Sequence, residues 1–273
     1  MDDSARVLVT GGGGVVGSRV VRALLSEGRK VRVLDTRYGE LEDEKENPDL
    51  EFMGIDVDDL HGGMADMRVV EESVRGTDVI YHLAVNWDGG NWKHALPLAD
   101  LFDANLRGTL NLLEAARSCG TKHFLFSSSV AVYGETERTL AMKRRVRYAK
   151  VSEVTACQPE LWTGDPGPAY AIMKLVSEKL CLMYYHQHRL PVTVFRLEYV
   201  FTGEGELRDG ANIHVDDVVR ALLLAESNEK TYGEVFNLAC PTPHVSTKKL
   251  QGVLGWRPEA TKAFSDHETP RKT

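Results

Sequence analysis

A tyrosine and a lysine stand four residues apart, at Tyr170 and Lys174, downstream of a run of three serines that ends at Ser129. On a helix, residues with this spacing lie about one turn apart on the same face. A lysine ammonium beside a phenol favours the phenolate, so we expect Lys174 to lower the pKa of Tyr170 from its usual value of ~10. Such a phenol can take a proton from an alcohol or return it to a carbonyl. The pair therefore predicts reversible hydride transfer at an alcohol carbon, with Ser129 hydrogen-bonded to the same oxygen, although two surface residues of a helix would show the same spacing.

A glycine-rich turn near the start of the chain fits the dinucleotide-binding pattern Gly-x-Gly-x-x-Gly, with Gly12, Gly14 and Gly17 at the three positions. Residues 6–9 predict a short buried strand before the turn, and residues 15–27 predict a helix after it. In this setting the glycines let the backbone approach a pyrophosphate closely, and the helix N-terminus faces the phosphates. The turn therefore predicts a site for a dinucleotide.

Asp35 follows the second predicted strand, residues 30–34, and lies 18 residues after Gly17. An acidic residue at this distance typically binds the adenosine ribose hydroxyls. Its charge favours NAD because it would repel the 2′-phosphate of NADP, whereas Arg37 could partly reverse that preference. The alternative is an ordinary loop aspartate. The cofactor contacts that we expect in this region are Gly11, Gly14, Val15, Val16, Gly17, Asp35, Thr36 and Arg37.

The composition is that of an ordinary globular protein, with 273 residues, 42% of them hydrophobic and 27% charged. A net charge of −7 disfavours nucleic-acid binding. The four cysteines form no Cys-x-x-Cys pair, which indicates reduced thiols and a cytoplasmic location. No signal region or long apolar run is present, so we expect no export and no membrane span.

Strands and helices alternate along the chain, which predicts an α/β fold with a Rossmann-type, doubly wound parallel sheet. The remaining predicted strands are residues 52–56, 78–83, 123–127 and 192–197, and the long helices are residues 100–118 and 169–188. Ligands of such sheets bind at the carboxyl ends of the strands, where Asp56, Ala84 and the serines fall. We expect a Rossmann domain with the Ser/Tyr/Lys site at 1–198 and a small substrate lobe at 199–273, which returns to the core near 213–240.

Further motifs extend over nearly the whole chain. They are Thr10–Ser18, His82–Ala84, Asn105 with Gly108–Ala116, Ser127–Gly134, Tyr170 with Lys174, Arg196, Ile213–Val218, Gly233–Leu238 and Leu254–Pro258. In this combination the sequence resembles the extended short-chain dehydrogenases/reductases of the NAD-dependent epimerase/dehydratase family.

That resemblance implies roles for individual residues. Ser129 would orient the substrate, Tyr170 would be the general acid/base, and Lys174 would lower the pKa of Tyr170 and hold the nicotinamide ribose. Asp56 and Val57 would contact adenine, Asn105 would support the active-site end of its helix, and Leu83, Ala84 and Ser127 would also contact the cofactor. The two long helices resemble those that form a four-helix dimer interface in the family, so a homodimer is expected; simple packing on the sheet is the alternative.

Two departures from the family bear on the substrate. Family dehydratases carry an Asp-Glu pair where this chain has Val130 and Ala131, and aliphatic side chains cannot transfer the proton that sugar dehydration needs. The chain also passes from Gly203 to His214 in 11 residues, where family epimerases build a longer pocket for a nucleotide sugar. The compact form is similar to uronate dehydrogenases and other small members that oxidise a free sugar acid or polyol.

The segment 143–150 carries five cations in an otherwise acidic chain, including Arg144 and Arg145. It could attract an anionic substrate, or it could be a solvated loop. The substrate contacts that we expect are Asn86, Trp87, Ser129, Val130, Arg144, Arg145 and Tyr199. No His, Cys or Asp spacing indicates a metal site.

Three functions remain compatible with the sequence. The first is an NAD-dependent dehydrogenase or reductase of a small, carbohydrate-like and possibly anionic substrate. The second is a sugar or nucleotide-sugar epimerase, such as a UDP-sugar 4-epimerase, which oxidises and reduces the same carbon. The third is a non-catalytic cofactor sensor, a class that usually lacks Tyr and Lys at these positions.

Overall fold

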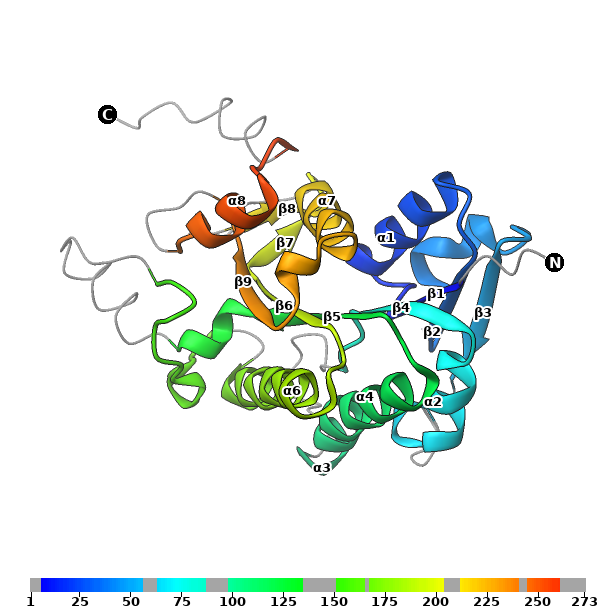
Figure 1. The fold of residues 1–273 in the computed structure, drawn as a ribbon, viewed down its shortest axis with the longest axis horizontal. Coiled ribbons are helices and arrows are strands. Elements are labelled where there is room, and N and C mark those ends of the chain that lie inside the picture. The colour runs from blue at the N-terminus through cyan, green and yellow to red at the C-terminus, as the bar shows by residue number, and fades with distance from the viewer. Residues whose placement is uncertain are drawn as a thin grey trace.

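The computed structural model describes residues 6–55, 63–86, 98–134, 151–164, 167–203, 212–240 and 245–260. Its centre is a parallel sheet of seven strands in the order β3-β2-β1-β4-β5-β6-β9 (Figure 1). The strands are β1 Arg6–Thr10, β2 Val31–Asp35, β3 Leu50–Gly54, β4 Thr77–His82, β5 His123–Ser129, β6 Val192–Leu197 and β9 Glu234–Leu238. The strand order reverses between β1 and β4, which confirms the predicted doubly wound sheet. Ligands of such sheets bind outside the carboxyl ends of the strands at this point.

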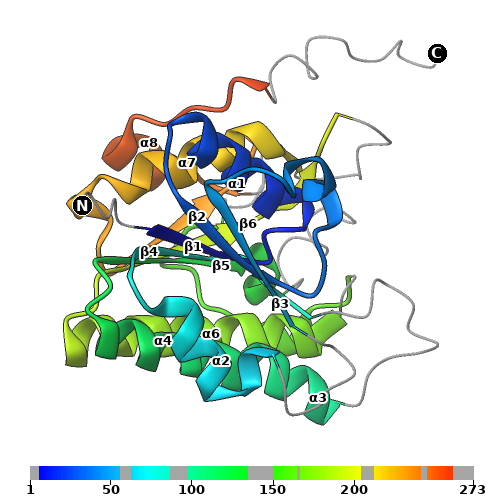
Figure 2. The same ribbon diagram turned by 90° about the vertical axis from the view of Figure 1, so that its right-hand side faces the viewer.

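Helices cover both faces of the sheet, as Figure 2 shows. One face carries α1 Val15–Ser26, α7 Val215–Glu226 and α8 Lys248–Leu254, and the other carries α2 Met67–Val74, α4 Gly108–Cys119 and α6 Gly167–His188. Strands buried on both faces are rich in Val, Ile, Leu and Phe, and their alternate side chains feed two separate apolar clusters. Within the described residues, no helix is long and apolar enough to cross a membrane.

The predicted element bounds are largely right, with one informative difference. Strand β6 has the predicted bounds, and β3 begins two residues earlier than residues 52–56. The helix predicted at 100–118 is instead three consecutive pieces: α3 Leu98–Phe102, a π-helical turn η4 Asp103–Arg107, and α4. A π-turn changes the hydrogen-bond register without interrupting the helix, so the apolar periodicity of the sequence does not reveal it.

Shorter elements complete the fold. Two strands, β7 Tyr199–Phe201 and β8 Asn212–His214, form a small parallel sheet of their own. The short 3₁₀ helices are η1 Gly39–Glu44, η2 Gly63–Ala65, η5 Val130–Tyr133, η6 Pro159–Leu161 and η7 Glu229–Thr231. Strand β9 and helix α7 belong to the main sheet and its cover, so residues after 198 contribute to the core. The domain boundary at 198 stays a prediction.

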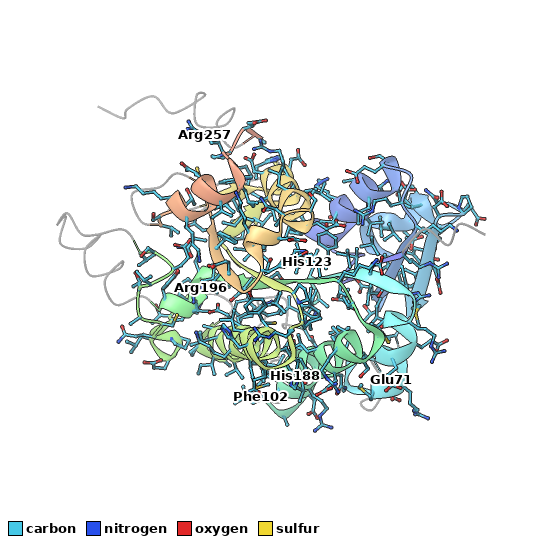
Figure 3. The ribbon with its side chains drawn as sticks, viewed as in Figure 1. Glu71, Phe102, His123, His188, Arg196 and Arg257 are labelled. Carbon is cyan, nitrogen blue, oxygen red and sulfur yellow. The ribbon has the colours of Figure 1, made fainter. Side chains whose placement is uncertain are left out.

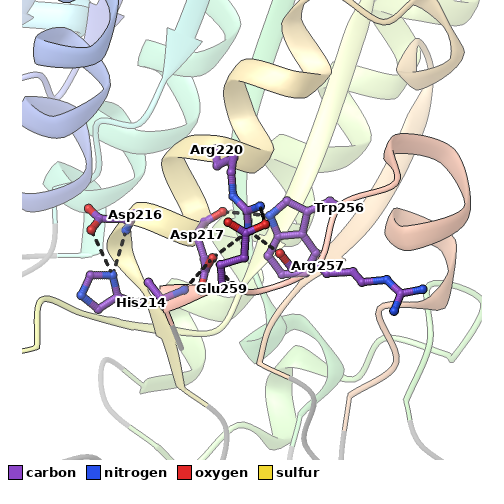
Figure 4. Close-up of polar contacts among 8 residues, drawn as sticks. His214, Asp216, Asp217, Arg220, Trp256, Arg257 and Glu259 are labelled. Atoms are coloured by element: carbon purple, nitrogen blue, oxygen red, sulfur yellow. Dashed lines mark hydrogen bonds and ion pairs between the residues drawn. The ribbon is translucent and has the colours of Figure 1, made fainter. Parts of the chain in front are cut away.

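The C-terminal segment is held against α7 by Asp217, which is buried (Figure 4). One carboxylate oxygen, Oδ1, accepts hydrogen bonds from Arg220 Nη2 at 2.9 Å and from the main-chain N–H of Glu259 at 2.8 Å. The main-chain oxygen of Asp217 accepts the indole N–H of Trp256 at 3.0 Å. His214 caps the same helix, because its ring accepts the N–H of Asp216 at 3.2 Å. The first turn of α7 thus fastens the end of the described chain to the core.

A buried ion pair joins α6 to the sheet. Arg196 on β6 donates to Glu178 on α6 through Nε at 2.9 Å and Nη2 at 2.6 Å, and both side chains are almost completely buried. Arg196 lies in the layer between the sheet and α6 (Figure 3). Its third nitrogen donates to the hydroxyl of Tyr133 at 2.7 Å, and Ser128 donates to Glu178 at 3.2 Å. These contacts satisfy both charges and fix α6 against β5 and β6.

Substitution of one member of this pair should destabilise the protein more than substitution of both. Glu178→Leu or Arg196→Met alone should lower the free energy of unfolding by about 3–5 kcal/mol, because one buried charge then lacks its partner. The double variant should recover a large part of that loss. Urea unfolding followed by circular dichroism measures both. Lys122→Met, which removes an exposed pair with Asp78, is the control and should cost at most about 1 kcal/mol; single core variants no worse than this control would contradict the prediction.

Candidate active site

Close backbone packing shapes the glycine turn after β1, as Gly11 and Gly17 show. Gly11 has φ +72°, and a Cβ there would lie 2.7 Å from the main chain of Ala84. A Cβ on Gly17 would lie 2.1 Å from the carbonyl oxygen of Gly11, so α1 packs directly on the turn. Gly14 differs, because a Cβ added there would make only an ordinary van der Waals contact, 3.4 Å from the carbonyl oxygen of Gly11. Gly14 is also exposed.

Gly14 is also the N-cap of α1, and no side chain caps that helix. The first-turn N–H groups of a helix attract anions, and the partial positive charge of its N-terminus adds to that attraction. Val15 is 40% exposed beside this end, whereas Val16 packs partly against the core. The space that Gly14 leaves open in front of the helix therefore fits the pyrophosphate of a dinucleotide.

Asp35 is the last residue of β2 and lies against the same turn. Its Oδ2 accepts the N–H of Gly13 at 2.8 Å, and its Oδ1 accepts the N–H of Thr36 at 2.7 Å. The carboxylate is only partly buried, and Thr36 and Arg37 beside it are exposed. This places a fixed negative charge next to the glycine turn, where it fits the ribose hydroxyls of a dinucleotide.

The three predicted catalytic residues come from two neighbouring elements. Strand β5 ends at Ser129, and the first half of α6 carries Tyr170 and Lys174. Ser129 forms a hydrogen bond with the phenol of Tyr170. The oxygen of Ser129 already accepts the N–H of Ala131 at 3.1 Å, so its own proton is available for another acceptor. Ser129 can therefore donate to the phenol oxygen or to a substrate oxygen in the same place.

Lys174 is held by the strand rather than by the phenol. Its Nζ donates to the main-chain oxygen of Ser127 at 2.7 Å, and it lies 5.7 Å from the centre of the Tyr170 ring. The ring of Phe126 lies 5.1 Å from the same ammonium. The side chain is 6% exposed, and burial lowers the pKa of Lys174 to about 8. A lysine in this setting is a weaker source of positive charge for the phenol than its spacing in the sequence indicates.

The expected lowering of the Tyr170 pKa is not what the structure shows. Burial raises the pKa of Tyr170 to about 12, and the hydrogen bond with Ser129 opposes that rise only in part. The physical reason is that removal of water disfavours the phenolate, while Lys174 directs its ammonium to Ser127. At neutral pH the phenol is therefore protonated and can act as a proton donor.

Asn105 lies in the π-turn η4 and clamps the loop that follows β4. Its side-chain Nδ2 donates to the main-chain oxygens of Asn86 at 2.8 Å and Leu101 at 2.9 Å. Its Oδ1 accepts the N–H of Asn86 at 2.9 Å. These hydrogen bonds join the π-turn to the loop after β4. The role of Asn105 in the site stays a prediction.

A narrow cavity of about 10 Å³ lies where these elements meet, with room for about one water molecule. Its lining residues are Ala84, Val85, Asn105, Thr109, Phe126, Tyr170, Met173, Lys174 and Ser177. Four predicted site residues thus converge here: Ala84, Asn105, Tyr170 and Lys174. A larger groove of about 580 Å³ between α1 and α7 contains no predicted site residue.

Other predicted site residues lie elsewhere. Val130 is 8% exposed and packs against Ala239 and Val245, Leu83 packs partly against the core, and Tyr199 on β7 is 43% exposed. Asp56, Val57, Trp87, Arg144 and Arg145 lie outside the described residues. No group of three or more His, Cys, Asp or Glu side chains in the described part of the chain could hold a metal ion.

Sequence reasoning missed two supports of the site. Glu178 lies one helical turn after Lys174 and pairs with Arg196, and Thr109 lines the cavity from α4. An acidic residue among the buried positions of a largely apolar helix is a signal that could have identified Glu178, because such a charge needs a buried partner.

The family of the chain follows from a match over most of its length. The model of the NAD dependent epimerase/dehydratase family matches residues 7–212. The chain belongs to this family. The match includes the glycine turn, Asp35, the three serines, Tyr170 and Lys174.

Individual relatives are more distant. The chain is 26% identical over 211 residues to GDP-mannose 3,5-epimerase 1 of Oryza sativa subsp. japonica, which covers 76% of this chain and 50% of the rice protein. It is 30% identical over 191 residues to UDP-N-acetyl-alpha-D-glucosaminuronate decarboxylase of Bacillus cytotoxicus, which covers 70% of this chain and 53% of that protein. The chain thus spans about half the length of these curated relatives.

Solved structures resemble the whole fold. A double mutant of the dTDP-glucose 4,6-dehydratase DesIV from Streptomyces venezuelae, with NAD bound, has a TM-score of 0.75 and 22% identity, covering 95% of this chain and 94% of that one. A mutated uronate dehydrogenase has a TM-score of 0.73 and 25% identity, covering 98% of this chain and 89% of that one. At 22% identity the likeness to DesIV establishes the fold and nothing further.

Proposed function

We propose that this chain is an NAD-dependent oxidoreductase that transfers hydride reversibly at a hydroxyl or carbonyl carbon of a sugar, sugar acid or polyol. The observation that carries the proposal is the meeting of Ser129, Tyr170 and Lys174 at the carboxyl end of β5, at the same edge of the sheet as the glycine turn. A dinucleotide site and a proton donor at one sheet edge are the two parts that such a reaction requires.

In the proposed mechanism the dinucleotide supplies the hydride chemistry when it is bound. Tyr170, which is protonated at neutral pH, donates its proton to the carbonyl oxygen during reduction. For oxidation the phenol must first be deprotonated, so that the phenolate can take the hydroxyl proton of the alcohol, and the hydrogen bond from Ser129 favours that phenolate. Lys174 keeps α6 in place on β5 through Ser127, so that the phenol faces the reacting oxygen.

The proposed substrate is a free sugar acid rather than a nucleotide sugar. Val130 and Ala131 are both buried, and their aliphatic side chains cannot supply the proton transfers of a dehydration. The similarity to a uronate dehydrogenase over 98% of the chain supports a sugar acid. The cations of segment 143–150 lie outside the described residues, and their part in attracting an anion stays a prediction.

A sugar epimerase is the second candidate. The similarity to GDP-mannose 3,5-epimerases favours it, because an epimerase uses the same cofactor and the same proton donor. An epimerase oxidises and reduces one carbon without releasing the cofactor, so it produces no net NADH. The presence of Tyr170 and Lys174 argues against a non-catalytic sensor.

The first experiment separates these candidates. We expect the purified chain to accumulate NADH when it is given NAD and a uronate, and to do so less readily with neutral sugars. Tyr170→Phe should lower turnover about 10²–10⁴-fold because the proton donor is lost, with cofactor affinity nearly unchanged. NADH absorbance and cofactor titration measure the two effects.

Tyr185→Phe, which removes another hydroxyl from α6, is the matched control and should retain activity. A Tyr170→Phe enzyme that keeps more than half of its activity would remove the tyrosine from the mechanism. Conversion of one sugar epimer to another without net NADH would replace the dehydrogenase by an epimerase.

We propose NAD rather than NADP as the cofactor, because Asp35 places a carboxylate beside the glycine turn. Asp35→Asn removes the charge while keeping an oxygen that can accept the N–H of Gly13. Since like charges in contact cost several kcal/mol, this variant should narrow the ratio of NAD to NADP affinities by about tenfold or more. Fluorescence titration with both cofactors measures it. Tighter binding of NADP than of NAD by the unaltered chain would contradict the assignment.

We also propose a homodimer formed through α4 and α6, in a reducing compartment such as the cytoplasm. Helices α3, α4 and α6 lie on the same side of the sheet (Figure 2). They carry four apolar side chains, Leu98, Phe102, Leu110 and Val176, that are between 38% and 59% exposed. All four cysteines are free thiols, which suits a reducing compartment. Leu110→Lys should convert the dimer to a monomer in sedimentation experiments, whereas an unaltered chain that is monomeric at every concentration would refute the dimer.

A further inference from the structure

His82 lies at the end of β4, buried between two threonines from different elements. It is 1% exposed, and the rings of Phe124 and Phe126 contact its ring. Its Nδ1 lies 2.8 Å from the hydroxyl of Thr10, which precedes the glycine turn. Its Nε2 lies 2.9 Å from the hydroxyl of Thr109 on α4. Each ring nitrogen of His82 therefore forms a hydrogen bond with a threonine hydroxyl group.

The neighbouring groups determine the direction of these hydrogen bonds. The hydroxyl of Thr109 donates to the main-chain oxygen of Asn105 at 2.6 Å, because a carbonyl can only accept. The oxygen of Thr109 is then left to accept the Nε2–H of His82. Because Nε2 then carries the one N–H proton of a neutral ring, Nδ1 is an acceptor and takes the hydrogen bond of the Thr10 hydroxyl. The oxygen of Thr10 in turn accepts the N–H of Ala84 at 3.3 Å.

These hydrogen bonds, together with the main chain of residues 84–86, form a closed ring. It begins at the N–H of Ala84 and passes through Thr10, His82 and Thr109 to Asn105. The side chain of Asn105 binds the main chain of Asn86 at both N–H and C=O, at 2.9 and 2.8 Å. Asn86 lies two residues after Ala84, so the loop 84–86 is held at both ends. We call these six residues the His82 circuit.

The circuit borders the proposed active site on two sides. Ala84, Val85, Asn105 and Thr109 line the cavity that also contains Tyr170 and Lys174. On the other side Gly11 packs closely against Ala84, since a Cβ added to Gly11 would lie 2.7 Å from the main chain of Ala84. A shift of the loop 84–86 would therefore disturb both the glycine turn and the wall of the cavity.

We propose that His82 is a positioning residue, held as the neutral Nε2–H tautomer, which couples the glycine turn to Asn105 and thereby fixes the loop 84–86. A neutral ring is needed because a second cation would face Lys174, and because a proton on Nδ1 would take away the acceptor that the hydroxyl proton of Thr10 has in the present arrangement. Burial and the Lys174 charge both lower the pKa of His82, to about 3. The predicted effect on NAD binding rests on the proposed function, whereas the circuit itself does not.

The first test is spectroscopic and independent of activity. We expect the ¹⁵N resonances of His82 to show the neutral Nε2–H tautomer throughout the pH range in which free histidine, with its pKa of ~6.5, titrates. Thr10→Val should also shift the side-chain amide resonance of Asn105, because the change is transmitted through the circuit. A neutral Nδ1–H tautomer, a normal titration of His82, or an unmoved Asn105 signal would each overturn the proposal.

The second test uses substitutions that keep the shape of the side chain. Thr10→Val and Thr109→Val each remove one hydroxyl, and each should weaken NAD binding by about tenfold, the effect of one lost buried hydrogen bond. Because both interrupt the same circuit, the double variant should be little worse than either single variant. Thr109→Ser, which restores the hydroxyl, should restore the affinity.

Thr121→Val is the matched control, because Thr121 is a buried threonine whose hydroxyl has no hydrogen-bond partner among the described residues. It should leave NAD binding unchanged. Additive losses in the double variant, or no loss in either single variant, would show that His82 only fills space. A chain that binds no NAD would refute the proposed function, and the ¹⁵N measurement would still decide whether the circuit exists.

Discussion

The buried pair of Arg196 and Glu178 is the contact on which the geometry of the site depends. Two opposite charges removed from water are tolerated only when their hydrogen bonds are complete, and here the guanidinium binds the carboxylate through two nitrogens. Glu178 lies one turn after Lys174 on α6, and Arg196 lies on β6. Because any slide of α6 would leave both charges unmatched, the helix that carries Tyr170 and Lys174 has one stable position on the sheet.

The hydrogen bonds of this pair continue to β9, the strand at the edge of the sheet. Arg196 binds the hydroxyl of Tyr133, which donates to Asn237 Oδ1 at 2.7 Å. The main-chain N–H of Asn237 donates to Glu153 at 2.8 Å, so the network reaches the segment 151–164. The His82 circuit holds the loop 84–86, of which Ala84 and Val85 line the cavity together with Lys174. Two buried polar networks, one charged and one neutral, thus support the proposed site, the first through α6 and the second through the loop 84–86.

Burial has a uniform electrostatic effect in this crevice. It raises the pKa of Tyr170 and lowers those of Lys174 and His82, so each group is shifted toward its neutral form. Ser129 opposes this shift at Tyr170, since its hydroxyl proton is free to stabilise the phenolate. Because the raised pKa keeps Tyr170 protonated, the site suits proton donation during reduction. Oxidation needs the phenolate and therefore depends more heavily on its stabilisation by Ser129.

The sequence by itself determined the sheet, the glycine turn and the residue types of the site. These features are local: buried parallel strands need continuous apolar runs, the turn before α1 needs glycines at Gly11 and Gly17, and a spacing of four places Tyr170 and Lys174 on one helix face. The bounds of β6 and the position of Asp35 at the end of β2 followed from the same periodicity.

Only the tertiary structure decided how these groups behave. Lys174 donates to Ser127 on another element, and desolvation by neighbours distant in sequence sets the pKa of Tyr170, so helical spacing alone predicted the wrong direction. The π-turn at Asn105 is a change of hydrogen-bond register that apolar periodicity does not encode. The partners of Arg196 and His82 come from other strands and helices, because a buried polar group takes whichever partner the fold brings within reach.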